Sequence, residues 1–302
     1  MPTFTGLIKL LRPQQWTKNA VCFAGAFFAR HMDAHSVFRA CLAAAAFCAA
    51  AGFVYILNDI FDCNRDRNHP SKRFRPIASG AVSVAQALAF AVPILGVAVG
   101  IGAYLGPAVL AILASYALLN ICYSAVFKNL SLVDAMVVAA GFILRIYAGA
   151  VAVEVPVSSW LLLCTLFLAL FLAFGKRRAE INATRSAIQQ EGAPKMDIAV
   201  TRGVLHKYNI AMLDRFCNIC ATLTIATYAL FTVLGHANHT LIITTPPVVM
   251  GIFRYILLVE RYQEGEAPEA ILFKDWAIQF AIAIWAILYI AVLYFGLQID
   301  VQ

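Results

Sequence analysis

The feature that most constrains this chain is a succession of long apolar runs. A helix needs about 20 mostly apolar residues to cross the hydrocarbon core of a bilayer, and about nine runs approach that length. They fall near residues 17–32, 36–60, 83–104, 106–127, 131–152, 157–175, 214–235, 239–260 and 276–297. Because the runs are continuous rather than alternating, they predict an all-α, polytopic membrane protein and not a membrane barrel. No repeat or long linker divides the chain, so we expect a single transmembrane domain over residues 1–302.

The composition agrees with this class. The chain is 62% hydrophobic and 13% charged, whereas soluble domains are roughly 45–50% apolar and about 25% charged. This excludes an ordinary soluble enzyme, a disordered tail and a disulfide-stapled secreted module. The net charge of +7 is then better explained by cytoplasmic loops and anionic phosphate ligands than by nucleic acid, which we do not expect as a partner.

Basic residues alternate from one set of loops to the other. They are dense in the N-terminal arm up to Lys18 and in two long loops near residues 61–82 and 176–213, whereas the opposite loops hold little beyond Arg30 and Arg39. Cytoplasmic loops are enriched in Lys and Arg. We therefore expect a multi-pass protein of a bacterial inner membrane, with the lipid bilayer as a partner, a cytoplasmic N-terminus and an external C-terminus.

The second apolar run ends in a group of carboxylates. Asp59, Asp62 and Asp66 are spaced i, i+3 and i+7, which places them on one face of a helix. Carboxylates stacked in this way repel unless a cation compensates them. Hard oxygen ligands of this kind, here with Asn58, suit Mg²⁺ together with substrate phosphates. The alternative is a solvated helix end whose acids pair with nearby arginines.

The loop that follows is basic and stiffened by Pro70 and Pro76. Its cations, Lys72, Arg73 and Arg75, lie close enough in sequence to reach the acidic face. Arginine binds phosphate through two parallel hydrogen bonds, and lysine acts as a point charge. The loop therefore predicts phosphate binding beside a metal. A simple membrane anchor remains the alternative.

A second polar cluster surrounds the turn between the fourth and fifth runs. Tyr123 and Lys128 end one run, and Asp134, Gly141 and Arg145 share a helical face in the next. An arginine deep in an apolar run is costly and marks a functional site by default. The alternative is a structural ion pair between this arginine and an acid of the bundle.

A third group of cations, which includes Lys176 and Arg177, follows the sixth run. These side chains could bind a phosphate or lipid headgroup, or simply complement the carbonyl end of a helix at the membrane surface. The sequence leaves both readings open.

The first acidic motif, Asn58-Asp59-x-x-Asp62-x-x-x-Asp66, resembles that of the UbiA superfamily of intramembrane prenyltransferases. The resemblance extends over essentially the whole chain. It implies a nine-helix bundle around a central cavity that opens to lipid, with Mg²⁺ held by Asp-rich motifs to activate a diphosphate. The chain departs from the usual pattern in its second motif, where Asp134 is the one acid and position 138 is Val138.

Further motifs are similar to one branch of that superfamily, decaprenyl-phosphate phosphoribosyltransferase. They are Arg12-Pro13-x-x-Trp16-x-Lys18-Asn19, His69-Pro70-x-Lys72-Arg73-Phe74-Arg75-Pro76-Ile77-Ala78, Gly141-Phe142-x-x-Arg145 and Gly175-Lys176-Arg177. The resemblance implies transfer of 5-phosphoribose from phosphoribosyl diphosphate to a polyprenyl (decaprenyl) phosphate. Its product would supply an arabinose-donor lipid for cell-wall polysaccharide such as arabinogalactan.

This hypothesis assigns roles to particular residues. We expect Asp59, Asp62 and Asp134 to be catalytic, and Asn58, Asp59, Asp62 and Asp66 to hold Mg²⁺. We expect substrate to be bound by Lys18, Lys72, Arg73, Arg75, Tyr123, Lys128, Arg145, Lys176 and Arg177. Two alternatives stay open: a UbiA-type enzyme that moves a prenyl group to an aromatic or other acceptor, and a membrane transporter that uses Arg145. The sequence also leaves both a monomer and a homo-oligomer open.

Overall fold

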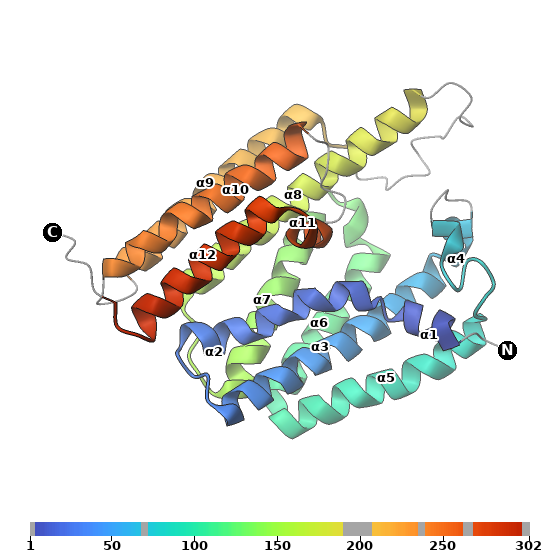
Figure 1. The fold of residues 1–302 in the computed structure, drawn as a ribbon. Helices are drawn as coiled ribbons and strands as arrows, with labels where there is room; N and C mark the ends of the chain where they lie inside the picture. Colours follow the sequence, from blue (N-terminus) through green and yellow to red (C-terminus); the bar gives the residue numbers. More distant parts are fainter. Residues whose placement is uncertain (1–3, 68–71, 190–206, 235–238, 262–267, 298–302) are drawn as a thin grey trace. The chain divides into compact units, whose positions relative to one another are not determined.

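The computed structural model describes residues 4–67, 72–189, 207–234, 239–261 and 268–297. These residues are helical or lie in turns and connections, and they contain no β-strand (Figure 1). They divide into two compact helical units, Met1–Val157 and Ser158–Gln302. The predicted all-α architecture is thus confirmed. Each unit is described on its own below.

The first unit contains four long helices and several short ones (Figure 1). Its elements are α1 (Phe4–Leu10), η1 (Pro13–Phe23), α2 (Ala24–Phe28), α3 (Ala34–Phe61), α4 (Cys63–Arg67), η2 (Lys72–Phe74), α5 (Val84–Leu105), α6 (Pro107–Ala125), η3 (Phe127–Asn129) and α7 (Val133–Val153). The elements named η are 3₁₀ helices. The four long helices, α3, α5, α6 and α7, are each long and apolar enough to cross a membrane.

Local sequence signals explain where two of these helices begin. The carboxylate of Asp33 accepts hydrogen bonds from the backbone amides of His35 and Ser36, which would otherwise lack partners at the start of α3. At the start of α5, Ser83 and Gln86 each accept a hydrogen bond from the other's backbone amide. This capping box satisfies two more amides of the first turn.

Helices α3 and α7 form the core of the first unit. Half of the most apolar window of α3 and 56% of that of α7 are buried, against 17% for α5 and α6. Alanines such as Ala43, Ala46 and Ala148 allow backbones to approach closely around Phe47 and Tyr116. The outer helices instead present large side chains outward, which suits contact with lipid.

The first expected run, residues 17–32, does not form a long helix. It is divided between η1 and α2, which end at Phe23 and Phe28. Polar residues within the run, Lys18 and Asn19, interrupt the apolar stretch that a spanning helix requires. Among the described residues, eight helical segments meet the length and hydropathy of a membrane span, and they correspond to the other eight expected runs.

The second unit contains four further spans. Its elements are α8 (Ser159–Gln189), α9 (Ile210–Leu234), η6 (His239–Thr244), α10 (Thr245–Arg261), α11 (Pro268–Lys274) and α12 (Trp276–Leu293). Helix α8 continues well past the expected end of its apolar run. Residues 176–189 of the expected loop are therefore helical, as suits a segment rich in Lys, Arg, Ala and Glu. Residues 190–206 of that loop lie outside the described residues.

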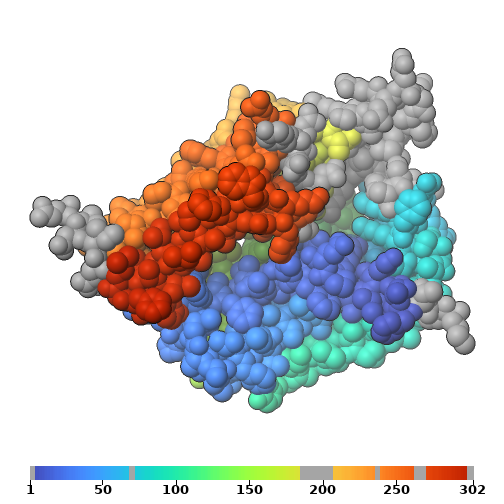
Figure 2. Space-filling model, in the orientation of Figure 1, coloured from blue at the N-terminus to red at the C-terminus, as the bar shows by residue number. Residues whose placement is uncertain are grey.

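Two buried hydroxyls of the second unit, those of Tyr228 and Thr244, find partners within it. The indole nitrogen of Trp285 on α12 donates to the hydroxyl of Tyr228 on α9 at 2.6 Å, and this hydroxyl lies 2.7 Å from that of Thr244. Such bonds spare polar groups from contact with hydrocarbon. Helix α12, red in Figure 2, carries large exposed apolar side chains that include Phe280, Ile282 and Ile287.

Candidate active site

The acidic residues lie where α3 gives way to α4. Asp59 is in the last turn of α3, Asp62 separates the two helices, and Asp66 is in α4. The backbone stays helical across the break, because the amide of Asp62 bonds the carbonyl of Asn58 and that of Asp66 bonds Asp62. Asp59 and Asp66 are each only 3% exposed. Two carboxylates are thus buried at the end of a membrane-spanning helix.

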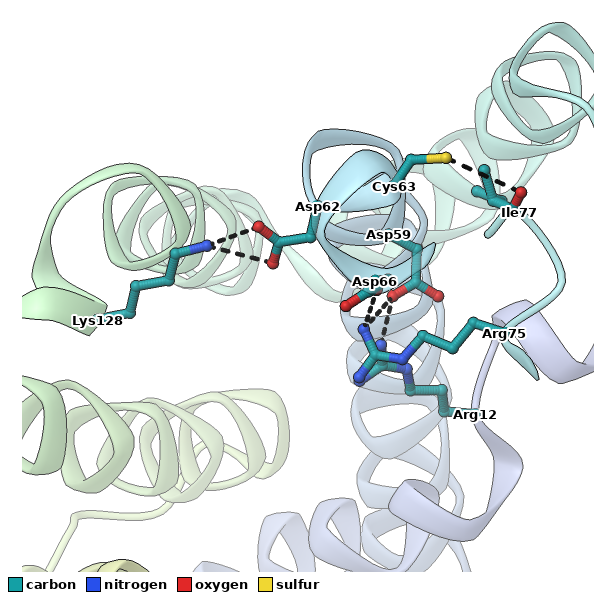
Figure 3. Close-up of polar contacts among 8 residues, drawn as sticks. All are labelled: Arg12, Asp59, Asp62, Cys63, Asp66, Arg75, Ile77 and Lys128. Atoms are coloured by element: carbon teal, nitrogen blue, oxygen red, sulfur yellow. Dashed lines mark hydrogen bonds and ion pairs between the residues drawn. The ribbon is translucent and has the colours of Figure 1, made fainter. Parts of the chain in front are cut away.

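The three acids do not all point the same way. Figure 3 shows Asp59 and Asp66 converging on Arg75, while Asp62 points to another side of the helix, toward Lys128. Helix geometry explains the difference. At about 100° per residue, positions seven apart return to within roughly 20° of each other, whereas positions three apart differ by roughly 60°. The predicted shared face is therefore confirmed for Asp59 and Asp66, whereas Asp62 points away from it.

Each carboxylate is matched by a cation from another part of the first unit. The Nη1 of Arg75 donates to Asp59 at 3.1 Å and to Asp66 at 2.8 Å. The Nη2 of Arg12 donates to Asp59 at 2.5 Å. The Nζ of Lys128, on η3, lies 2.9 Å from the nearer oxygen of Asp62. These pairings compensate the repulsion among the acids. Arg12 was not among the residues expected to bind substrate or metal, although it lies in one of the sequence motifs.

The basic loop is held so that Arg75 faces the acids. Ile77, two residues further on, is buried with Leu10, Ile56 and Val82. This packing fixes the backbone next to Arg75. Of the other two expected loop cations, Arg73 is exposed and its guanidinium lies 4.8 Å from the ring centre of its neighbour Phe74. Lys72 is partly buried at the start of η2.

The intramembrane Arg145 is buried within the first unit. Its Nε donates to the side-chain oxygen of Asn19 at 2.7 Å, Nη1 to the carbonyl of Gly141 at 2.8 Å, and Nη2 to the hydroxyl of Tyr116 at 3.0 Å. The ring of Phe47 lies against the guanidinium as well. Within the described residues, Arg145 forms no ion pair with a carboxylate, so its charge is stabilised by neutral acceptors and aromatic faces.

The remaining expected residues of the first unit lie on different elements. Asp134 is fully buried in the first turn of α7. Tyr123 lies near the end of α6 and Lys18 within η1, and both are partly buried. The sequence analysis did not identify two residues that bond Arg145, namely Asn19 and Tyr116. Asn19 could have been found, because it belongs to a motif, whereas nothing in the sequence distinguishes Tyr116 from other tyrosines in apolar runs.

The cations of the second unit lie in the extended part of α8. Arg177 is 3% exposed and its Nη1 donates to Glu180 at 3.0 Å. Lys176 precedes it and is partly buried. The neighbouring Arg178 bonds Asp214 of α9 at 2.5 Å and the carbonyl of Val259 in α10 at 2.7 Å. This arginine ties three helices of the second unit together at one end and borders a small pocket.

A divalent cation was expected among the acids. Within the described residues, no group of three or more His, Cys, Asp or Glu side chains is arranged to hold a metal ion. The donors nevertheless fit one. A single cationic nitrogen of Arg75 lies within hydrogen-bond distance of both Asp59 and Asp66. The buried side-chain oxygen of Asn58 has no hydrogen-bond partner among the described residues. These are hard oxygen donors of the kind that Mg²⁺ prefers.

Comparison with known proteins places the chain among membrane transferases. It is 32% identical to decaprenyl-phosphate phosphoribosyltransferase of Corynebacterium glutamicum, over 96% of this chain and 87% of the relative. It is 32% identical to the protein of that name from Mycobacterium tuberculosis, over 93% of this chain and 91% of the relative. Both relatives are enzymes, which argues against the transporter alternative.

The fold has solved counterparts. A UbiA homologue from Archaeoglobus fulgidus, whose structure was determined bound to GPP and Mg²⁺, superposes with a TM-score of 0.71 at 17% identity, covering 96% of this chain and 99% of that one. At this identity the likeness establishes the fold. The profile of the UbiA prenyltransferase family matches residues 19–282, which include the acidic helix end and Arg145. The chain therefore belongs to the UbiA prenyltransferase family.

Proposed function

We propose that this membrane transferase moves 5-phosphoribose from phosphoribosyl diphosphate to a polyprenyl phosphate such as decaprenyl phosphate. The observation that carries the proposal is the acidic end of α3, where three acids meet Arg12, Arg75 and Lys128. Acids that can hold a metal and cations that can hold phosphate are what a diphosphate donor requires. The names of the relatives favour phosphoribose as the group transferred.

Asp59, Asp62 and Asp66, with Asn58, would hold Mg²⁺ on the donor diphosphate. When bound, the ion would neutralise charge that develops on the leaving group. Asp134 would orient a nearby cation or contribute to a second metal site. On this assignment the donor's diphosphate lies at the end of α3 in the first unit.

The cations around the acids would bind the phosphates directly. Arg12, Arg75 and Lys128 already reach the carboxylates and would share their hydrogen bonds with the diphosphate. Lys18, Lys72, Arg73 and Tyr123 would bind the remaining phosphates of the substrates. Phosphoribosyl diphosphate carries three phosphate groups, so it requires more cations than a prenyl diphosphate does.

The transfer itself needs little proton chemistry. An oxygen of the lipid phosphate attacks the anomeric carbon of ribose, and the bond from that carbon to the diphosphate oxygen breaks with its electron pair leaving on diphosphate. Positive charge develops on the sugar as it does in glycosyl transfer. The attacking oxygen is already ionised near neutral pH, so no general base is needed. Attack opposite the leaving group would invert the configuration.

Lys176 and Arg177 of the second unit are proposed to bind either the lipid phosphate or the ribose 5-phosphate. Arg177 is held by Glu180, which fixes the direction of its guanidinium. The site would face the cytoplasm of a bacterial inner membrane, and the isoprenoid tail would lie among apolar helices. The product would serve as a precursor of the arabinose-donor lipid of cell-wall polysaccharide.

The competing function is transfer of a prenyl group from a prenyl diphosphate to an aromatic or other acceptor. The family name covers such enzymes. The sequence of α7 disfavours prenyl transfer, because Asp134 is the one acid in that helix and Val138 occupies the position where a second acid would be expected. We therefore retain prenyl transfer as an outcome of the test and not as a second proposal.

The test uses the purified full-length chain with phosphoribosyl diphosphate labelled in its ribose and with decaprenyl phosphate. We expect label in the lipid product with Mg²⁺, none with chelator, and none from Asp59→Asn. The matched control is Asp33→Asn, which makes the same change at an exposed helix cap where Asn also caps well. Labelled lipid without Mg²⁺ or with Asp59→Asn would refute the metal assignment. Transfer from a labelled prenyl diphosphate instead would favour the competing function.

A further inference from the structure

The turn at Arg12 is held in a strained conformation. Its φ of 49° and ψ of 63° are left-handed, a region that residues other than glycine rarely adopt. In this conformation the guanidinium bonds Asp59 and lies 4.7 Å from the ring centre of Tyr55. Strained backbone of this kind persists only where the surrounding structure fixes it from both sides. The segments on either side of Arg12 must therefore be anchored.

On the N-terminal side, the anchor is apolar. Leu10 is fully buried and packs in a cluster with Ile56 and Ile77. The indole nitrogen of Trp16 also donates to the carbonyl of Leu11 at 3.2 Å, which closes the turn around Arg12. These contacts fix the start of the turn to the end of α3.

On the C-terminal side, the anchor is polar. Asn19 of η1 is 2% exposed, and its side-chain oxygen accepts the hydrogen bond from Nε of Arg145. The other two guanidinium nitrogens bond Gly141 and Tyr116, so Arg145 is held rigidly while it holds Asn19. Arg145 therefore joins η1 to α7 at a site buried from solvent.

A second contact brings the same two elements unusually close together. Gly149 of α7 lies against the backbone of Cys22 in η1, and a Cβ atom at position 149 would overlap the carbonyl group of Cys22. In α2, which directly follows η1, Gly25 packs in the same way on Ala150, where an added Cβ would be 2.8 Å from the Cβ of that alanine. Because neighbouring backbone would have to move, these contacts require glycine.

We infer that Asn19, Arg145 and Gly149 are positioning residues, which hold η1 on α7 and thereby hold Arg12 against Asp59. On this inference Arg145 acts through this segment, whereas the sequence led us to expect that it binds substrate directly. The holding of Arg12 stands on contacts within the first unit alone. Its consequence for catalysis, tighter binding of the donor diphosphate, rests on the proposed function.

Hydrogen exchange on the full-length protein in detergent micelles tests the holding without any substrate. Asn19→Leu removes the acceptor of Arg145, and Gly149→Ala introduces the overlap with Cys22. Both should speed exchange at the backbone amides of residues 14–23 by about tenfold or more. Gly100→Ala is the matched control, because a Cβ there meets nothing within 4 Å. Asn19→Asp keeps an acceptor oxygen and should restore slow exchange.

Kinetics then test the route through Arg12. Asn19→Leu should raise the KM for phosphoribosyl diphosphate roughly tenfold, with kcat and the KM for the lipid little changed. In an Arg12→Gln background the same substitution should cause no further rise, because the residue through which it acts is already lost. If Asn19→Leu raises the donor KM by the same factor in the Arg12→Gln background as in the unaltered chain, Asn19 does not act through Arg12.

The two proposals can fail separately. If the unaltered chain transfers no phosphoribose, the proposed function fails, and exchange still decides whether Asn19 and Gly149 hold the segment. If transfer proceeds but exchange over residues 14–23 is the same in Asn19→Leu as in the unaltered chain, the positioning inference is overturned.

Discussion

Substitution of Arg75 tests whether the buried acids of the site depend on the cations that pair with them. Its Nη1 bonds Asp59 and Asp66, each only 3% exposed, whereas the side chain of Arg75 itself is 27% exposed. Replacing it in Arg75→Gln removes the cation that these two carboxylates share. Asp59 keeps Arg12, so Asp66 bears most of the loss.

The size of the effect follows from these contacts. A hydrogen bond to a charged group contributes about 1.5–3 kcal/mol. One such bond is lost without replacement, and solvent around the partly exposed arginine screens it, so we expect about 1–2 kcal/mol of lost stability. On the proposed function Arg75 also binds the donor's diphosphate, so its loss should raise the donor KM about tenfold or more.

A double variant separates the two effects. In Arg75→Gln/Asp66→Asn the unpaired acid is removed, so the stability should return toward that of the unaltered chain. The donor KM should stay high, because the phosphate contact is still missing and Asp66 is itself a proposed ligand of Mg²⁺. Arg65→Gln, an exposed arginine on α4, is the matched control and should change neither property by much.

The assays are thermal unfolding in detergent micelles and the donor KM from labelled transfer. Recovery of the donor KM in the double variant would show that Arg75 acts on the donor only through Asp66. Unchanged stability and KM in the single variant would contradict the pairing of acids and cations altogether.

Substitutions at three other ion pairs have separate expected outcomes. Arg178→Met should destabilise the second unit by about 1–3 kcal/mol, because it removes the ion pair with Asp214 and the hydrogen bond to the carbonyl of Val259. Asp214→Asn should lower the stability by less, and thermal unfolding of both variants measures the difference. Lys128→Gln should raise the donor KM in labelled transfer while leaving the fold intact, since Asp62 is partly solvated; an unchanged KM would remove this lysine from the site. Hydrogen bonds from Arg254 lower the pKa of Asp275, so the stability that this acid contributes is present above its unfolded pKa of about 3.9 and is lost as pH falls through the lowered folded value. Asp275→Asn should therefore flatten the acid side of a stability–pH curve, and an identical curve would contradict that contribution.

Much of the fold was predictable because a bilayer imposes a simple rule. Eight of the apolar runs form spans, and seven of them lie within a few residues of the expected ends, since continuous hydrophobicity of sufficient length has few other stable solutions. The run at 17–32 was not predictable in this way. It is short and polar at Lys18 and Asn19, and its shape depends on Arg145 and Gly149, more than a hundred residues away in the chain.

The candidate site was predictable in its residue types but less so in its pairings. Helix periodicity correctly places Asp59 beside Asp66, because the rule is local. The partner of each acid is set by tertiary structure. Thus the contacts of Asp59 with Arg12 and of Asp62 with Lys128 could not be read from spacing. The surroundings of Arg145 illustrate the same limit, because neutral acceptors stabilise it where an acid was one expectation.

A structure of the full-length chain with Mn²⁺ and phosphoribosyl diphosphate would locate the metal and the donor directly. We expect an anomalous peak about 2.0–2.3 Å from carboxylate oxygens of Asp59 and Asp66, with the donor's diphosphate against it and within reach of Arg75. A peak and a donor bound elsewhere, with Asp59 and Asp66 still paired only to Arg12 and Arg75, would contradict it.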